Sequence, residues 1–211
     1  MIECIVFDLD GTLVKSHETI YKTTVKTLEK LGLQTDLDYG KFYNLLGHHF
    51  ADIFKECNIE VPDVEYFIQV YKDMYFDFME DSNLYPNVEY VLKELQNKKV
   101  KTGLLTTKGH DQAIKISNHF KIAKYLDQIE GRKSGIAIKP APDQLLNICR
   151  DLNVVPQKTM MVGDTELDIL CGKNADAKSC AVSYGYRDVA EIKKLNPDYL
   201  IDDLKEILEL I

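Results

Sequence analysis

The stretch CIVFDLDGT, residues 4–12, decides the fold that we expect for this 211-residue chain. Its first four residues form an apolar run typical of a buried strand, and the run ends at Asp8. Similar short runs follow at residues 102–105, 159–162 and 179–182, with a weaker one at 199–201. Near-continuous apolar runs are typical of a parallel sheet that is covered on both faces.

Amphipathic patterns with helical spacing separate these runs. They cover residues 88–95, 113–120, 145–152 and 204–211. This alternation predicts an α/β fold, a Rossmann-like doubly wound parallel sheet. Active sites in such folds lie beyond the carboxyl ends of the strands, so the residues after each strand are the first candidates for function.

Residues 16–81 interrupt the alternation, because they contain helical patterns and no strand pattern. A stripe of mostly aromatic side chains recurs there at helical spacing: Phe67, Val70, Tyr71, Met74 and Phe78. We interpret the stripe as packing between helices. The sequence therefore predicts an all-helical domain at 16–81, inserted into a core domain made of residues 1–15 and 82–211.

Composition and charge limit the classes of molecule that the chain is expected to bind. A formal net charge of -8 argues against nucleic acid, because binding to its phosphate backbone needs clustered Lys and Arg. The five cysteines are scattered without a CxxC pair, so neither a zinc cluster nor a disulfide framework is indicated. No apolar run approaches the roughly 20 residues that span a bilayer, and the N-terminus lacks a signal-peptide pattern. We expect a cytoplasmic protein that does not bind a membrane.

The first candidate block follows the strand at residues 4–7. Asp8 and Asp10 are two residues apart, so both side chains can point to one side of an extended chain. Gly11 suits a tight turn at this point. A turn built from Asp and Gly with no further role is the alternative.

Two more blocks offer groups that can hold a phosphate. Thr106, Thr107 and Lys108 follow the run at 102–105. The hydroxyl and free backbone amides there can bind phosphate oxygens, or Thr106 can cap the next helix. Lys139 opens the proline-stiffened segment KPAPD, in which Asp143 can cap a helix that begins near residue 144. A solvated surface charge is the alternative for Lys139.

The fourth block is GDTELD at residues 163–168. Asp164 and Asp168 are four residues apart, which places both acids near the same pole of one helical turn. Helix capping by acids, which the helix dipole favours, is the alternative.

Together, the four blocks resemble the haloacid dehalogenase-like phosphatase superfamily in order and spacing, from Ile5 to Leu208. The resemblance is strongest to the branch that contains phosphoglycolate phosphatases, pyrophosphatases and β-phosphoglucomutases. That branch carries a helical cap after the first block, which implies that residues 16–81 form a cap domain. Residues 182–186 and 197–202 also resemble the C-terminal part of this branch. Asp176 departs from it, because glycine is usual at that turn.

The resemblance implies a phosphatase that acts on small phosphorylated metabolites. Asp8 is then the nucleophile and forms an aspartyl-phosphate. Asp10 protonates the leaving oxygen and later deprotonates the attacking water. Thr106 and Lys139 hold the oxygens of the transferring phosphoryl group.

The resemblance also implies a Mg²⁺ cofactor, which prefers carboxylate and carbonyl oxygens. Its ligands are the side chains of Asp8 and Asp164 and the backbone carbonyl of Asp10. Asp168 orients the water molecules around the ion instead of binding it directly.

Substrate contacts are expected from two places. Thr107 and Lys108 lie in the second block. Gly47, His48 and His49 lie where the cap loop reaches the active site in this family. The alternative is that the two histidines are exposed loop residues without a role.

A phosphosugar mutase of the β-phosphoglucomutase type is the nearest alternative. Thr12 replaces an apolar residue usual in mutases, Gly163 and Asp164 stand where mutases have paired acids, and Phe50 replaces an arginine that binds a second phosphate. Hydrolysis is therefore favoured. An inorganic pyrophosphatase and a non-catalytic, partner-binding member of the superfamily are further alternatives, although the latter has no need of Asp8 and Asp164. The physiological substrate and the oligomeric state are left open.

Overall fold

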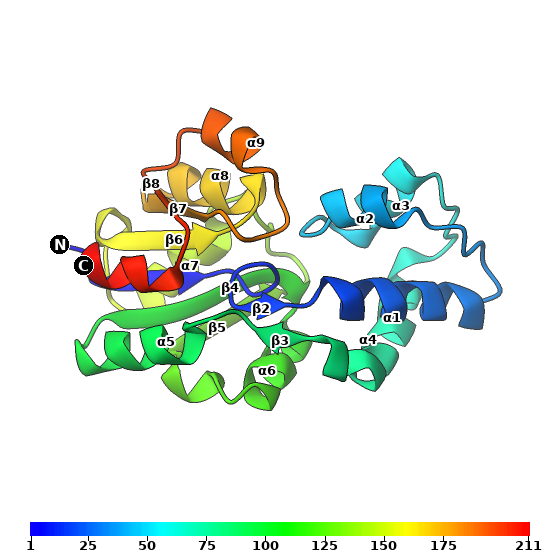
Figure 1. Ribbon diagram of the computed structural model, residues 1–211, viewed down its shortest axis with the longest axis horizontal. Helices are drawn as coiled ribbons and strands as arrows, with labels where there is room; N and C mark the ends of the chain where they lie inside the picture. The colour runs from blue at the N-terminus through cyan, green and yellow to red at the C-terminus, as the bar shows by residue number, and fades with distance from the viewer. The chain divides into compact units, whose positions relative to one another are not determined.

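A parallel sheet organises the larger part of the chain, and the computed structural model describes all residues from 1 to 211. The strands of the sheet are β1 (Cys4–Phe7), β4 (Lys101–Gly109), β5 (Gln128–Arg132), β6 (Thr159–Gly163), β7 (Lys178–Val182) and β8 (Tyr199–Ile201). Their order is β5-β4-β1-β6-β7-β8 (Figure 1), and every neighbouring pair is parallel. The predicted α/β fold is confirmed.

Strand β1 lies between β4 and β6, as the blue strand between green and yellow in Figure 1. Phe7 pairs with Leu104 on one side and with Val162 on the other. All four residues of β1 are fully buried, as expected for a central strand covered on both faces. Because the strands are parallel and in this register, Asp8 leaves the sheet at the same edge as the residues after Val162.

Five α-helices belong to the same part of the chain: α5 (Val88–Asn97), α6 (His110–His119), α7 (Asp143–Asp151), α8 (Glu166–Asn174) and α9 (Val189–Lys194). Short 3-10 helices η2 (Ala123–Tyr125), η3 (Pro156–Lys158) and η4 (Leu204–Glu209) complete it. Leu145 and Ile148 of α7 pack with Cys4 and Val6 of β1 in one buried cluster. Side chains alternate along a strand, so Ile5 and Phe7 are buried in the opposite face.

Three details differ from the expectation. Strand β5 was not predicted, because its sequence QIEGR contains a single large apolar residue, Ile129. Its buried Glu130 pairs instead with Lys133, at 2.8 Å. The helix expected at 204–211 is the shorter 3-10 helix η4, and Asp143 is the first residue of α7 and not its cap.

The chain divides into two units by its internal contacts. We call Met1–Val14 with Leu84–Ile211 the core unit and Lys15–Asn83 the helical unit. The helical unit contains α1 (His17–Lys30), α2 (Tyr39–Asn44), α3 (Phe50–Cys57), α4 (Val64–Met74) and the 3-10 helix η1 (Tyr75–Asp81). Two-residue strands β2 (Val14–Lys15) and β3 (Asn83–Leu84) pair where the chain passes from one unit to the other.

Aromatic side chains form the interior of the helical unit. Phe54 contacts Phe67 edge to face, with ring centroids 4.8 Å apart, and Phe50 contacts Tyr71 at 4.8 Å. Phe67 and Tyr71 are buried, which confirms that the aromatic stripe packs helices together. None of the helices in the chain is both long enough and apolar enough to cross a bilayer.

Candidate active site

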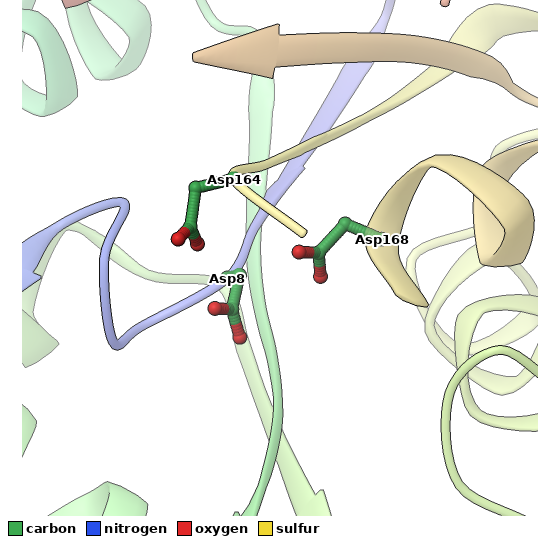
Figure 2. A group of neighbouring side chains, drawn as sticks. All are labelled: Asp8, Asp164 and Asp168. Carbon is green, nitrogen blue, oxygen red and sulfur yellow. The ribbon is translucent and has the colours of Figure 1, made fainter. Parts of the chain in front are cut away.

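Three carboxylates meet at the carboxyl edge of the sheet. Asp8 follows β1, Asp164 follows β6, and Asp168 lies in the first turn of α8 (Figure 2). One oxygen from each lies within 4.8 Å of the others, and all three side chains are buried. They converge because β1 and β6 are neighbours whose last residues are in register.

Lys139 brings the one buried ammonium group into this cluster. Its Nζ donates to Oδ1 of Asp8 at 2.7 Å and to Oδ1 of Asp168 at 2.5 Å. Burial alone would lower the pKa of Lys139, but Asp168 and Asp8 outweigh burial and raise the pKa above its ordinary value. Lys139 is therefore charged, and the alternative of a solvated surface lysine is wrong.

The carboxylates are held in an environment that disfavours their negative charge. Burial raises the pKa of Asp8 well above its ordinary value, Lys139 opposes this, and Asp168 adds to it. Burial likewise raises the pKa of Asp164 to about 7, with a further contribution from Asp168. One ammonium cannot balance three carboxylates. A divalent cation would remove the excess charge, and these hard oxygen donors fit Mg²⁺.

Asp164 is fixed by donors from two distant segments. Thr12 Oγ1 donates to Oδ1 of Asp164 at 3.2 Å, and the backbone N–H of Tyr186 donates to Oδ2 at 2.8 Å. Gly11 has φ +88°, and a Cβ added there would lie 2.3 Å from Oδ2 of Asp164. Glycine is thus required at this position both for the turn and for the close approach of Asp164.

Both oxygens of Asp168 accept hydrogen bonds inside the core unit. Oδ2 accepts from the backbone N–H of Thr165 at 3.0 Å and from its hydroxyl at 2.7 Å. Oδ1 accepts from Lys139, as described above. A Cβ on Gly163 would lie 2.1 Å from Cγ of Asp168, so glycine before Asp164 makes room for this carboxylate.

The second block lies beside Asp10. Nζ of Lys108 donates to Oδ2 of Asp10 at 3.0 Å, and both side chains are nearly buried. Thr106 is buried within β4, and its Oγ1 accepts from the backbone N–H of Lys108 at 3.2 Å. Strand β4 continues through the half-buried Thr107 to Gly109, which precedes α6. The alternative in which Thr106 caps a helix is therefore wrong.

Gly47, His48 and His49 lie in the helical unit, between α2 and α3. His49 has a local structural part, because its Nδ1 accepts from the backbone N–H of Ala51 at 3.3 Å and caps α3. The backbone N–H of His48 donates to the carbonyl of Leu45 at 3.1 Å. The group brought together at the edge of the sheet consists of core-unit residues alone.

Sequence reasoning assigned no role at the metal site to Thr12 or to the loop after β7. Gly185 lies so close to Asp164 that a Cβ there would be 2.1 Å from the aspartate Cβ. Tyr186 supplies the amide that binds Asp164, and Arg187 binds Glu166. The signal that could have found this loop is the position of β7 beside β6, because loops at adjacent carboxyl ends meet.

Comparisons with known proteins agree with this geometry. Residues 5–182 match the family described as haloacid dehalogenase-like hydrolase. A relative from Clostridium perfringens, whose assignment as pyrophosphatase PpaX is provisional, is 33% identical over 100% of this chain and 98% of its own length. Pyrophosphatase PpaX of Oceanobacillus iheyensis is 27% identical over 100% of this chain and 97% of its own.

Solved structures share the fold over nearly the whole chain. A predicted phosphoglycolate phosphatase from Haemophilus somnus has a TM-score of 0.83 at 25% identity, covering 99% of this chain and 97% of that one. CbbY from Rhodobacter sphaeroides, in complex with xylulose-(1,5)-bisphosphate, has a TM-score of 0.84 at 20% identity, covering 96% and 95%. The second likeness concerns the fold alone.

Proposed function

This chain belongs to the haloacid dehalogenase-like hydrolase family, and on that premise we propose that it is a magnesium-dependent phosphatase of small phosphorylated metabolites. One observation carries the proposal. The buried carboxylate of Asp8 lies 2.7 Å from the ammonium of Lys139 and within 4.8 Å of Asp164 and Asp168. A nucleophilic carboxylate, a fixed cation and two further acids are the groups that phosphoryl transfer requires at one point.

Asp8 is the nucleophile in the proposed mechanism. Lys139 binds Oδ1 of Asp8 and leaves Oδ2 to attack phosphorus. The new O–P bond forms as the bond from phosphorus to the leaving oxygen breaks, which gives an aspartyl-phosphate. Asp10 donates its proton to the leaving oxygen and then takes a proton from the water that attacks the phosphorus. Phosphate leaves, and the Asp8 carboxylate is restored.

Mg²⁺ would be held by the side chains of Asp8 and Asp164 and by the backbone carbonyl of Asp10. Bound there, the ion would supply positive charge that lets a carboxylate approach a phosphate dianion. Asp168 accepts from three donors, Lys139 at Oδ1 and the backbone N–H and hydroxyl of Thr165 at Oδ2, whereas Asp164 has one donor at each oxygen. This difference supports a part for Asp168 in orienting the water molecules around the ion and not in binding it directly.

Contacts to the substrate are assigned to the second block and to the helical unit. Thr106 and Lys139 would hold the phosphoryl oxygens. Lys108, next to Asp10, would bind the substrate together with Thr107. We propose that the helical unit acts as a cap over the site and that His48 and Gly47 select the leaving group. Free cysteines throughout the chain are consistent with our proposal of a cytoplasmic protein.

Inorganic pyrophosphate is a second candidate substrate. Two relatives that match the full length of this chain carry the name pyrophosphatase PpaX, one of them provisionally. A mutase is disfavoured, since Thr12 binds Asp164 and Phe50 packs against Phe54 and Tyr71 in the helical unit.

The proposal is tested by measuring phosphate release in the presence of Mg²⁺ from a panel of substrates. The panel contains an aryl phosphate, phosphoglycolate, sugar phosphates, nucleotides and pyrophosphate. We expect Asp8→Asn to abolish release and Asp151→Asn, at an exposed site, to leave it unchanged. With the aryl phosphate, whose leaving group needs no proton from Asp10, Asp10→Asn should accumulate phosphate on Asp8 that base or hydroxylamine removes, because the variant cannot activate water. Equal activity in Asp8→Asn would refute the mechanism. Absence of activity on every compound would favour a binding protein, and a preference for pyrophosphate would favour the second candidate.

A further inference from the structure

Arg187 and Glu166 form a partly buried ion pair at the edge of the site. Nε of Arg187 donates to Oε2 of Glu166 at 2.7 Å, and Nη2 donates to Oε1 at 3.1 Å. The Arg187 side chain is only 10% exposed. Such two-point contacts between a guanidinium and a carboxylate fix orientation as well as distance.

This pair joins the two segments that determine the position of Asp164. Glu166 is the first residue of α8, two residues after Asp164. Arg187 directly follows Tyr186, whose N–H donates to Oδ2 of Asp164 at 2.8 Å. The two contacts between the segments are therefore one residue apart in the loop after β7 and two residues apart in the segment that leads into α8. A backbone amide can orient a carboxylate only while its own loop is held, and the Arg187–Glu166 contact holds it.

The loop also binds the second donor to Asp164. The hydroxyl of Tyr184 donates to the backbone carbonyl of Thr12 at 3.1 Å, and Thr12 in turn donates to Oδ1 of Asp164. Gly185 leaves no space between the loop and Asp164, because a Cβ there would be 2.1 Å from the aspartate Cβ. A shift of the loop would therefore move both donors and the carboxylate together.

Nη1 of Arg187 is buried and donates no hydrogen bond. An unsatisfied buried donor lowers stability, so stability alone does not explain the position of this guanidinium.

We propose that Arg187 and Glu166 are a positioning pair, which holds the Tyr186 amide and through it the Asp164 carboxylate in the orientation that binds Mg²⁺. The proposal rests on the proposed function, in which Asp164 is a Mg²⁺ ligand. Neither residue touches the ion or the substrate in this scheme.

The experiment measures Mg²⁺ binding to metal-stripped protein by titration calorimetry, without substrate. We expect Arg187→Met to raise the Kd for Mg²⁺ by about tenfold, the lower end of what loss of an outer contact to a metal ligand costs. Arg187→Lys should give an intermediate value, because an ammonium cannot bind both oxygens in a fixed geometry. Glu166→Leu with Arg187→Met should be no worse than Arg187→Met alone, since the pair acts as a unit.

Lys178→Met is the matched control. It breaks an exposed ion pair of β7, in which Nζ lies 2.8 Å from Oδ1 of Asp198, and should leave the Kd unchanged. If Arg187→Met does not fold, Arg187→Lys and Glu166→Gln answer the same question. A fall in Tm with an unchanged Kd would overturn the inference, because a purely structural pair behaves that way. Absence of Mg²⁺ binding by the unaltered protein would overturn the proposed function itself and the inference with it.

Discussion

Nζ of Lys139 lies 2.7 Å from Oδ1 of Asp8, and both side chains are buried. The two residues are 131 positions apart in the sequence. The same ammonium binds Asp168, so a single cation stabilises two of the three carboxylates. In the mechanism proposed above, stability and catalysis therefore depend on the same group, which makes Lys139 the most informative position for mutation.

Replacing Lys139 by Met should lower the free energy of unfolding by about 3–5 kcal/mol, because removal of one partner leaves buried carboxylates without a cation. Phosphatase activity should be lost as well. Urea denaturation measures the first effect and phosphate release the second. Lys158→Met, which breaks an exposed pair with Glu3, should change stability by about 1 kcal/mol or less. Full stability in Lys139→Met would contradict the structure of the cluster.

Gly185→Ala should weaken Mg²⁺ activation. The added methyl group would lie 2.1 Å from Cβ of Asp164, so the loop or the carboxylate must move. We expect the Mg²⁺ concentration for half-maximal activity to rise by about tenfold or more. Gly40→Ala is the control, because its Cβ would meet only Oδ1 of Asp38, at 3.6 Å in helix α2. The control should keep full activity and gain up to about 1 kcal/mol of stability. Equal metal requirements in the two variants would show that the loop has room to move.

The fold could be predicted from the sequence because the buried strands are nearly continuous apolar runs. That signal located β1 and β6 and therefore the positions of Asp8 and Asp164 at their ends. The signal of apolar runs failed for β5, because this strand buries Glu130. The ion pair with Lys133 offsets the free-energy cost of burying that carboxylate. Local sequence does not show that a buried glutamate has a partner.

Contacts between distant segments could not be predicted. Lys139 follows no strand, and only family resemblance assigned it to the site. The roles of Thr12, Gly185 and Arg187 depend on three loops that meet only after the sheet has formed. No pattern within a single segment reports such contacts, since the two partners of each lie on different segments of the chain.

Removal of the metal should make stability depend on pH in a defined direction. The pKa of Asp164 is raised by burial to about 7 in the folded protein, so the folded state binds a proton more tightly than the unfolded state does. Stability from this proton is therefore present at low pH and is lost as the pH rises through about 7. In EDTA, unfolding free energy should increase by roughly 0.5–1 kcal/mol from pH 8 to pH 6.5.

The window ends at pH 6.5 because burial lowers the pKa of His17, whose protonation at lower pH opposes folding. Saturating Mg²⁺ should reduce the dependence on pH, since the ion favours the ionised carboxylate. The measurement is urea denaturation across this range with EDTA or with Mg²⁺. Asp164→Asn in EDTA should reduce the slope, and the part that is left is assigned to Asp8, whose pKa burial also raises. An unaltered protein that becomes less stable between pH 8 and pH 6.5 would contradict the buried state of Asp164.

His48 and His49 should differ in what they do. His49 caps α3 through Nδ1, so His49→Ala should lower the free energy of unfolding by about 1 kcal/mol through loss of that hydrogen bond. His48→Ala should change selectivity, because we assign His48 to contact with the leaving group. Its effect is measured as kcat/KM for each substrate of the panel. We expect the ratio of kcat/KM between the best and the second-best substrate to change by about fivefold, which is equivalent to about 1 kcal/mol. His119→Ala, on α6 of the core unit, serves as the control. If His48→Ala scales every substrate by the same factor, the residue takes no part in selection and the helical unit recognises substrates through other side chains.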